Sequence, residues 1–94
     1  MISSDILASY AGDAAREVEG VEDLVEGTLP RHKGVRILEE DDQVRVELRL
    51  RVAWGACIPE VGKEVQRRVA AYLARMASVT PLSIDVTVEE IGPR

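Results

Sequence analysis

The sequence predicts an α+β fold, a two-layer sandwich in which two helices pack on one face of a mixed sheet of three to four strands. Residues 44–54 alternate between apolar and mostly charged side chains, as a strand with one buried face does. Residues 7–18 and 61–76 carry apolar side chains at intervals of three and four, which is helical spacing. With the remaining segments, the predicted order is α-β-β-β-α-β.

Length and composition favour one domain, 1–94, with an aliphatic core. The 94 residues are 46% hydrophobic but only 3% aromatic and contain no Phe. The net charge of −5 disfavours a general nucleic-acid binder. The acidic bias lies in residues 1–30, where seven acids stand against Arg16 alone.

A first helix is expected from a cap at Ser3 or Ser4 to about Val18, and Gly20 is placed to end it. Its apolar stripe consists of Leu7, Ala11, Ala14 and Val18, widened by Ile6, Tyr10 and Ala15. Residues 21–25 are compatible with either a short strand or part of the connection. Residues 26–34 contain the Gly, Pro and charges of an exposed loop.

Residues 35–39 and 44–54 are predicted to form an antiparallel hairpin around a turn at 40–42. The second strand should direct Trp54 and its other apolar residues to one face. A corner at Gly55–Ile58 follows, and Pro59 suits the first helical position. Gly55 is expected to meet a backbone requirement there, and Gly62 to permit close packing of the next helix on the sheet.

The second helix should bury one stripe and expose a charged one. The predicted buried stripe is Val61, Val65, Val69, Tyr72, Leu73 and Met76, and the predicted exposed residues are Lys63, Glu64, Arg67, Arg68 and Arg75. Glu64 has helical spacing for ion pairs with Arg67 and Arg68. Residues 78–81 should end the helix.

Residues 82–88 alternate again and predict a last strand, parallel to the 44–54 strand because a helix connects the two. Both helices must then cover the same apolar face. The opposite face presents Arg45, Glu47, Arg49 and Arg51 beside Asp85, Thr87 and Glu89. This row is either a solvated face with cross-strand ion pairs or an interaction surface. Trp54 is either a core-edge residue or a partner anchor.

No catalytic, metal or cofactor site is predicted. His32 lacks a second ligand at metal-binding spacing. Cys57 before a helix could in principle be a nucleophile with His32, but no residue pattern supplies an orienting group, and a structural thiol is the simpler interpretation. The basic run Arg31–Lys33, with Arg36 nearby, is too short for a polybasic membrane or phosphate site.

Several motifs resemble the bacterial alkaline shock protein family, also called Gls-type general stress proteins. They are Val18–Val21 (VEGV), Gly34–Ile37 (GVRI), the run from Val44 to Val69 and the last strand from Ile84 to Ile91. The most specific part is Gly-x-x-Ile-Pro-Glu-Val from Gly55, followed by Val65-Gln66. Trp54 departs from the Tyr that is common there, and the segment between Val21 and Gly34 is shorter and more charged.

This resemblance implies a cytoplasmic, non-enzymatic protein of the envelope stress response. Such proteins self-associate and are held at the inner face of the membrane by a membrane-embedded partner. We expect no signal peptide, no direct membrane insertion and no nucleic-acid partner. The alternative is a small α/β nucleic-acid-binding domain, although the exposed strands lack aromatic residues for base stacking.

Overall fold

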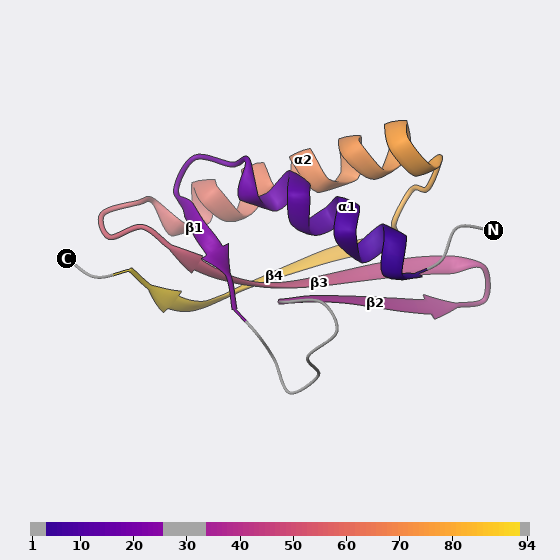
Figure 1. The fold of residues 1–94 in the computed structure, drawn as a ribbon, viewed down its shortest axis with the longest axis horizontal. Helices are drawn as coiled ribbons and strands as arrows, with labels where there is room; N and C mark the ends of the chain where they lie inside the picture. The colour runs from indigo at the N-terminus through magenta and orange to yellow at the C-terminus, as the bar shows by residue number, and fades with distance from the viewer. Residues whose placement is uncertain (1–3, 26–33, 93–94) are drawn as a thin grey trace.

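The computed structural model describes residues 4–25 and 34–92. It contains helices α1 (Ser4–Arg16) and α2 (Ile58–Ala77) and strands β1 (Val21–Leu24), β2 (Val35–Glu40), β3 (Gln43–Val52) and β4 (Ser83–Ile91). Both helices lie on the same side of the sheet, as Figure 1 shows. The α+β class, the two layers and the order α-β-β-β-α-β are therefore confirmed.

Strand β3 is the centre of the sheet, because it pairs with each of the other three strands. Strand β4 runs parallel to β3, whereas β1 and β2 run antiparallel to it. β1 pairs with residues 50–52 of β3 and β2 with residues 43–48. Since β4 occupies one edge of β3, β1 and β2 lie end to end along the other. The sheet is mixed, as predicted, and residues 21–24 are a strand.

The β2–β3 hairpin turns through two residues, Asp41 and Asp42, between the paired residues Glu40 and Gln43. Both aspartates have positive φ angles, 50° and 64°. Two successive positive φ angles give a turn whose twist matches that of the flanking strands. The predicted turn is confirmed.

The apolar face of β3 forms the floor of the core. Val46, Leu48, Leu50 and Val52 are each at most 1% exposed. Trp54 does not continue this face, because β3 ends at Val52 and Trp54 is 59% exposed. The chain turns immediately afterwards, with a hydrogen bond from the Ala56 N–H to the Ala53 carbonyl and φ of 86° at Gly55. The prediction that Trp54 belongs to the strand and its buried face was wrong.

Helix α1 covers the core with small side chains, and the predicted stripe of Leu7, Ala11, Ala14 and Val18 is buried. The helix ends at Arg16, two residues before the predicted end, so Val18 packs on the core from the segment that follows it. Ile6 is exposed instead of widening the stripe. After the helix, Gly20 has φ of 98°, and a Cβ there would lie 2.8 Å from the Val61 side chain. Gly20 thus lets the chain turn close to α2. The predicted cap at Ser3 lies outside the described residues.

Helix α2 is bounded by Cys57 at its N-cap and Ser78 at its C-cap, and Pro59 lies in its first turn. Its buried residues are Val61, Val65, Val69, Leu73 and Ala77, a strict interval of four. Met76 was predicted to be buried but is 45% exposed, because Ala77 occupies the next inward position after Leu73. Gly62 was expected to permit close packing, yet a Cβ there would meet nothing within 4 Å.

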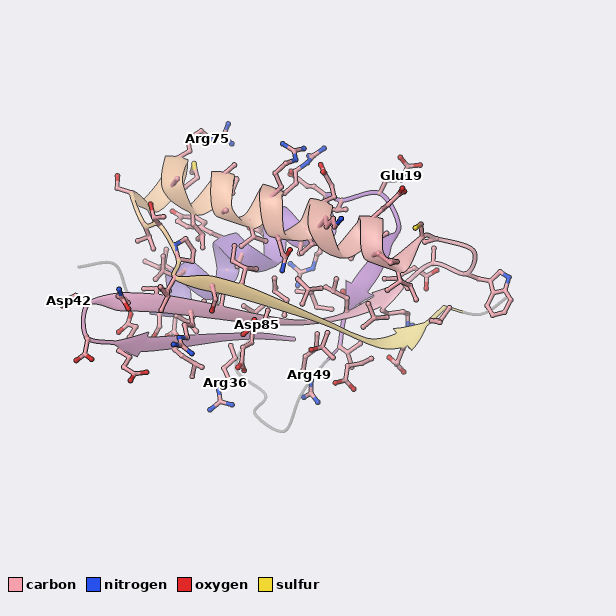
Figure 2. All side chains as sticks on the ribbon, turned by 180° about the vertical axis from the view of Figure 1, so that it is seen from behind. Glu19, Arg36, Asp42, Arg49, Arg75 and Asp85 are labelled. Atoms are coloured by element: carbon pink, nitrogen blue, oxygen red, sulfur yellow. The ribbon has the colours of Figure 1, made fainter. Side chains whose placement is uncertain are left out.

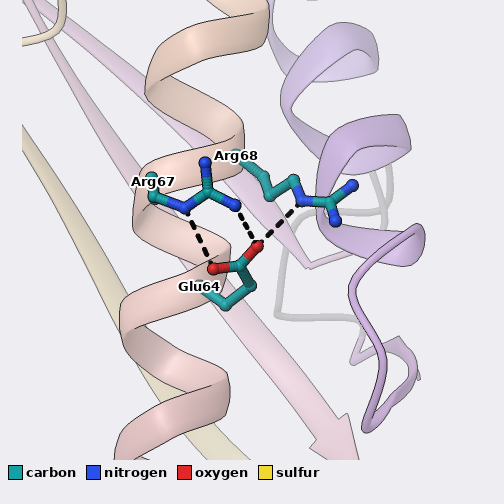
Figure 3. Close-up of polar contacts among 3 residues, drawn as sticks. All are labelled: Glu64, Arg67 and Arg68. Carbon is teal, nitrogen blue, oxygen red and sulfur yellow. Dashed lines mark hydrogen bonds and ion pairs between the residues drawn. The ribbon is translucent and has the colours of Figure 1, made fainter.

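The outer face of α2 carries a three-residue ion cluster, shown in Figure 3. Glu64 accepts hydrogen bonds from two nitrogens of Arg67, including Nε at 3.0 Å, and from Arg68 Nε at 2.9 Å. The hydrogen bonds from Arg67, and then those from Arg68, lower the pKa of Glu64 from 4.5 to about 2. The predicted pairs at spacings of three and four are therefore present.

Candidate interaction surface

The face of the sheet opposite the helices carries the charged row of β3, which we call the polar face. Side chains at Arg45, Glu47, Arg49 and Arg51 alternate with the buried ones and so lie on this face. β4 aligns Asp85 with Glu47, and Thr87 with Arg49. Figure 2 shows Arg36 and Arg49 on the side of the sheet away from α2. The predicted residues of the interaction surface, apart from Trp54, are therefore together on one face.

Two ion pairs join β3 to β4 across this face. Arg49 Nη2 lies 3.0 Å from Glu89 Oε1, and Arg51 Nη2 lies 3.3 Å from Glu90 Oε2. The side chains are between 33% and 48% exposed, so solvent screens both pairs. Each pair contributes about 0.2–1 kcal/mol. These ion pairs contribute little to the stability of the sheet, and their main effect is to position the charged side chains on its surface.

A bulge explains how the consecutive residues Glu89 and Glu90 both reach the same face. The register passes from Leu50 opposite Val88 to Arg51 opposite Glu90, so Glu89 is an extra residue. An extra residue bends the strand and interrupts the alternation of side chains. Sequence reasoning missed Glu90, because a regular strand would direct it to the face opposite Glu89.

One row of the polar face contains two neighbouring acids. Arg36 of β2 and Asp85 of β4 flank Glu47, and Arg36 Nη1 is 3.9 Å from Glu47 Oε1. Asp85 and Arg45 form no ion pair or hydrogen bond through their side chains with any residue that the structure describes. Leu38, half-buried, lies directly opposite Arg45. The polar face thus combines satisfied ion pairs with charges that have solvent as their neighbour.

Trp54 lies beyond the end of β3 and not on the polar face. Ile58 and Ile91 are also exposed, and Ile91 is aligned with Val52, two residues before Trp54. Exposed aromatic and aliphatic side chains are candidate anchors for a partner. Of the two interpretations of Trp54, exposure disfavours the core and leaves the partner anchor as a prediction.

The other candidate groups do not come together in the described part of the chain. Cys57 is exposed at the N-cap of α2. His32 and the basic run Arg31–Lys33 lie outside the described residues. Within residues 4–25 and 34–92, no group of three His, Cys, Asp or Glu side chains is arranged to hold a metal ion. Neither α1 nor α2 is long and apolar enough to cross a bilayer.

Comparisons with solved structures place the fold among known α+β domains. A double variant of the MamM C-terminal domain superposes with a TM-score of 0.70 at 15% identity, over 95% of this chain and 84% of that one. Another MamM C-terminal domain variant gives a TM-score of 0.65 at 14% identity, over 97% and 100% of the two chains. At these identities the likeness establishes the fold alone.

The fold and the charged surface define a two-layer α+β domain with an open, ion-paired sheet face. A family model described as "Asp23 family, cell envelope-related function" matches residues 1–93. The chain therefore belongs to the Asp23, or alkaline shock protein, family, as its motifs suggested. The family name is unrelated to residue Asp23 of this chain. YqhY of Bacillus subtilis (strain 168), described as uncharacterized, is 29% identical over 97 residues, which cover 93% of this chain and 72% of YqhY.

Proposed function

We propose that this chain is a non-enzymatic binding protein of the cell envelope. It self-associates through the polar face and docks to a membrane-anchored partner at the cytoplasmic side of the membrane. The observation that carries the proposal is the open polar face, which spans β2, β3 and β4 opposite the helix layer. Membership of a family with a cell envelope-related function supports the proposal that the protein acts at the cell envelope.

The polar face carries arginine side chains that can form hydrogen bonds and ion pairs with a partner protein. Arginine is enriched at protein interfaces because its planar guanidinium forms several directed hydrogen bonds and its stem adds apolar contact. Arg45 lacks an ion pair within the described part of the chain, and Leu38 beside it is half-buried. A second copy in a two-fold arrangement would supply an acid to Arg45 and cover Leu38 in both copies at once.

Self-association is tested by multi-angle light scattering after size exclusion over a range of protein concentrations and salt. We expect an oligomer whose mass falls in the double variant Arg49→Glu, Arg51→Glu, because that change places four acids together around Glu89 and Glu90. Lys63→Glu makes a charge reversal on exposed helix surface and should leave the mass unchanged. A monomer at every concentration would refute self-association.

Docking is tested by affinity capture from native cells with the membranes retained. We expect a membrane protein to be recovered with the wild-type chain. Recovery of soluble enzymes alone would contradict docking, whatever the result for self-association. Tight RNA binding that weakens steeply with salt would instead favour the nucleic-acid alternative.

A further inference from the structure

The outer edge of β4 is an open strand edge. Among the residues that the structure describes, β4 pairs with β3 alone. In Figure 2, β4 crosses in front of β3 with its other edge toward the viewer. The nine residues Ser83–Ile91 contain neither Pro nor Lys, which often protect such edges from further pairing. The bulge at Glu89 interrupts this edge near its end, so the regular part, residues 83–88, is where another strand can add.

The backbone hydrogen bonds show which groups face outward. Arg49 uses its N–H and its C=O toward the β1 and β2 side, with Gly34 and Val25 as partners. Because successive residues alternate, Leu48 and Leu50 direct their backbone groups toward β4. The parallel register then joins them to Asp85 and Thr87, so the groups of Ile84, Val86 and Val88 face away from β3.

A side chain already uses the first acceptor on this edge. Gln66 of α2 donates from Nε2 to the Ile84 carbonyl oxygen at 2.8 Å. This bond confirms that the Ile84 carbonyl faces outward. The N–H and C=O groups of Val86 and Val88 remain for an incoming strand.

The charges beside the edge favour a basic strand. Asp85 is aligned with Glu47, so two carboxylates lie side by side, and of the two only Glu47 has an ion-pair partner among the described residues, Arg36 at 3.9 Å. A cation on an added strand opposite Asp85 would complete the row Arg36, Glu47, Asp85. A second copy of β4 in the same place would instead bring Asp85 and Glu89 against like charges, which is destabilising.

The other side of the edge is apolar. Ile84, Val86 and Val88 lie on the face toward the helices, and all three are only half-buried although they pack against the core. Their exposed parts lie where the side chains of an added strand would pack. Such a strand must therefore alternate between apolar side chains toward the helix layer and polar or basic ones toward the polar face.

We propose that the edge of β4 binds an extended segment of a partner protein in which basic and apolar residues alternate. The segment adds as a strand to Val86 and Val88, with a basic side chain opposite Asp85. The inference rests on the partner-docking part of the proposed function, and it is independent of self-association through the polar face.

The probe is a nine-residue peptide of alternating Lys and Val, compared with an alternating Glu and Val peptide and with a peptide of the same Lys and Val content in two blocks. We expect saturable binding of the first peptide alone, measured by fluorescence polarisation. Bound peptide should slow hydrogen exchange of the Ile84, Val86 and Val88 amides. Equal binding of the Glu peptide or the block peptide would overturn the proposal.

Two variants test the site within the folded chain. Val86→Pro removes an N–H that faces away from β3, so it removes no hydrogen bond to β3, and Pro is tolerated on edge strands. This variant should weaken peptide binding at least tenfold. Asp85→Lys should also weaken it, whereas Glu19→Lys, the same charge change on exposed surface away from β4, should not. A retained amide spectrum shows that each variant is folded.

Unchanged affinity in both variants would overturn the edge as the binding site. Protection of the same three amides at high protein concentration without peptide would identify a second copy as the occupant and would also overturn the proposal. Because light scattering reads self-association separately, a monomeric chain that still binds the Lys peptide would support this inference while refuting the other.

Discussion

Gln66 and Ile84 connect the helix layer to the outermost strand of the sheet. The Gln66 side chain, on α2, donates a hydrogen bond to the backbone carbonyl of Ile84, on β4, at 2.8 Å. Most of the contact between these layers is apolar and therefore has no direction. This hydrogen bond gives α2 a directed contact with β4 and fixes their relative position along the strand.

Replacing Gln66 by Ala should reduce the free energy of unfolding by about 0.5–1.5 kcal/mol, because one directed hydrogen bond is lost. Urea denaturation followed by circular dichroism measures the change. Gln43→Ala is the matched control, since Gln43 is exposed at the start of β3, and its effect should stay within about 0.5 kcal/mol. Equal effects of the two substitutions would contradict a role for the bond.

Glu64 should make stability depend on pH in the acid range. Its pKa is lowered from 4.5 to about 2 by Arg67 and Arg68, so in this window the unfolded chain binds the proton more readily than the folded chain. The contribution of Glu64 is therefore complete above about 4.5 and is lost as the pH falls toward 2. Carboxyl carbon NMR should follow the titration of Glu64 directly.

Glu64→Gln should remove this part of the pH dependence, so that the difference in stability from the wild type shrinks as the pH falls below 4.5. Glu60→Gln, which removes a carboxylate one turn earlier in the same helix, is the comparison variant for the pH dependence of stability. A Glu64 carboxyl that titrates at 4.5 in the folded chain would contradict the cluster.

Leu73 and Met76 lie on adjacent turns of α2 but in opposite environments. The Leu73 side chain is buried, at 0% exposure, whereas Met76 is 45% exposed. Leu73→Ala should cost about 2–5 kcal/mol of unfolding free energy, because it leaves a cavity in the core. Met76→Ala should cost far less, within about 0.5–1 kcal/mol, because solvent already reaches the side chain. Thermal unfolding distinguishes the two, and a large loss at Met76 would show that this face is covered in solution.

Gly62 and Gly55 should respond to alanine with opposite signs. Gly62 is inside α2 with open space at its Cβ position, so Gly62→Ala should stabilise the chain by about 0.5–1 kcal/mol. Gly55 also has open space, but its φ is 86°, where a Cβ costs about 1–2 kcal/mol. The midpoint of urea unfolding should rise in the first variant and fall in the second.

The sequence was sufficient for the fold wherever one period persisted. The alternation in β3 and the interval of four in α2 located the core, because each period directs a whole row of side chains to one face. Trp54 and Met76 were misassigned at the ends of these patterns, where the chain turns at Gly55 and where Ala77 takes the inward position. The four-residue strand β1 was ambiguous because only Leu24 is fully buried in it.

The candidate site was also predicted from the periodicity of the strands, and the prediction failed where that periodicity is interrupted. The residues of the polar face followed from the alternation, but their pairing depends on the bulge at Glu89. The pair EE before an isoleucine does not reveal a bulge, so Glu90 could not be assigned to a face. The exposed edge of β4 also depended on knowing which strands are neighbours, which a single sequence with short connections does not determine.

The central position of β3 also constrains the order in which the sheet can assemble. Among the described residues, β1 and β4 have no strand partner other than β3, and Val21 of β1 pairs with Val52 at the far end of it. During synthesis, β1 is therefore made before its partner residues in β3 exist. Until β4 has been made, through residue 91, the nascent chain can form the β2–β3 turn but cannot complete the sheet, so one edge of β3 has no strand partner.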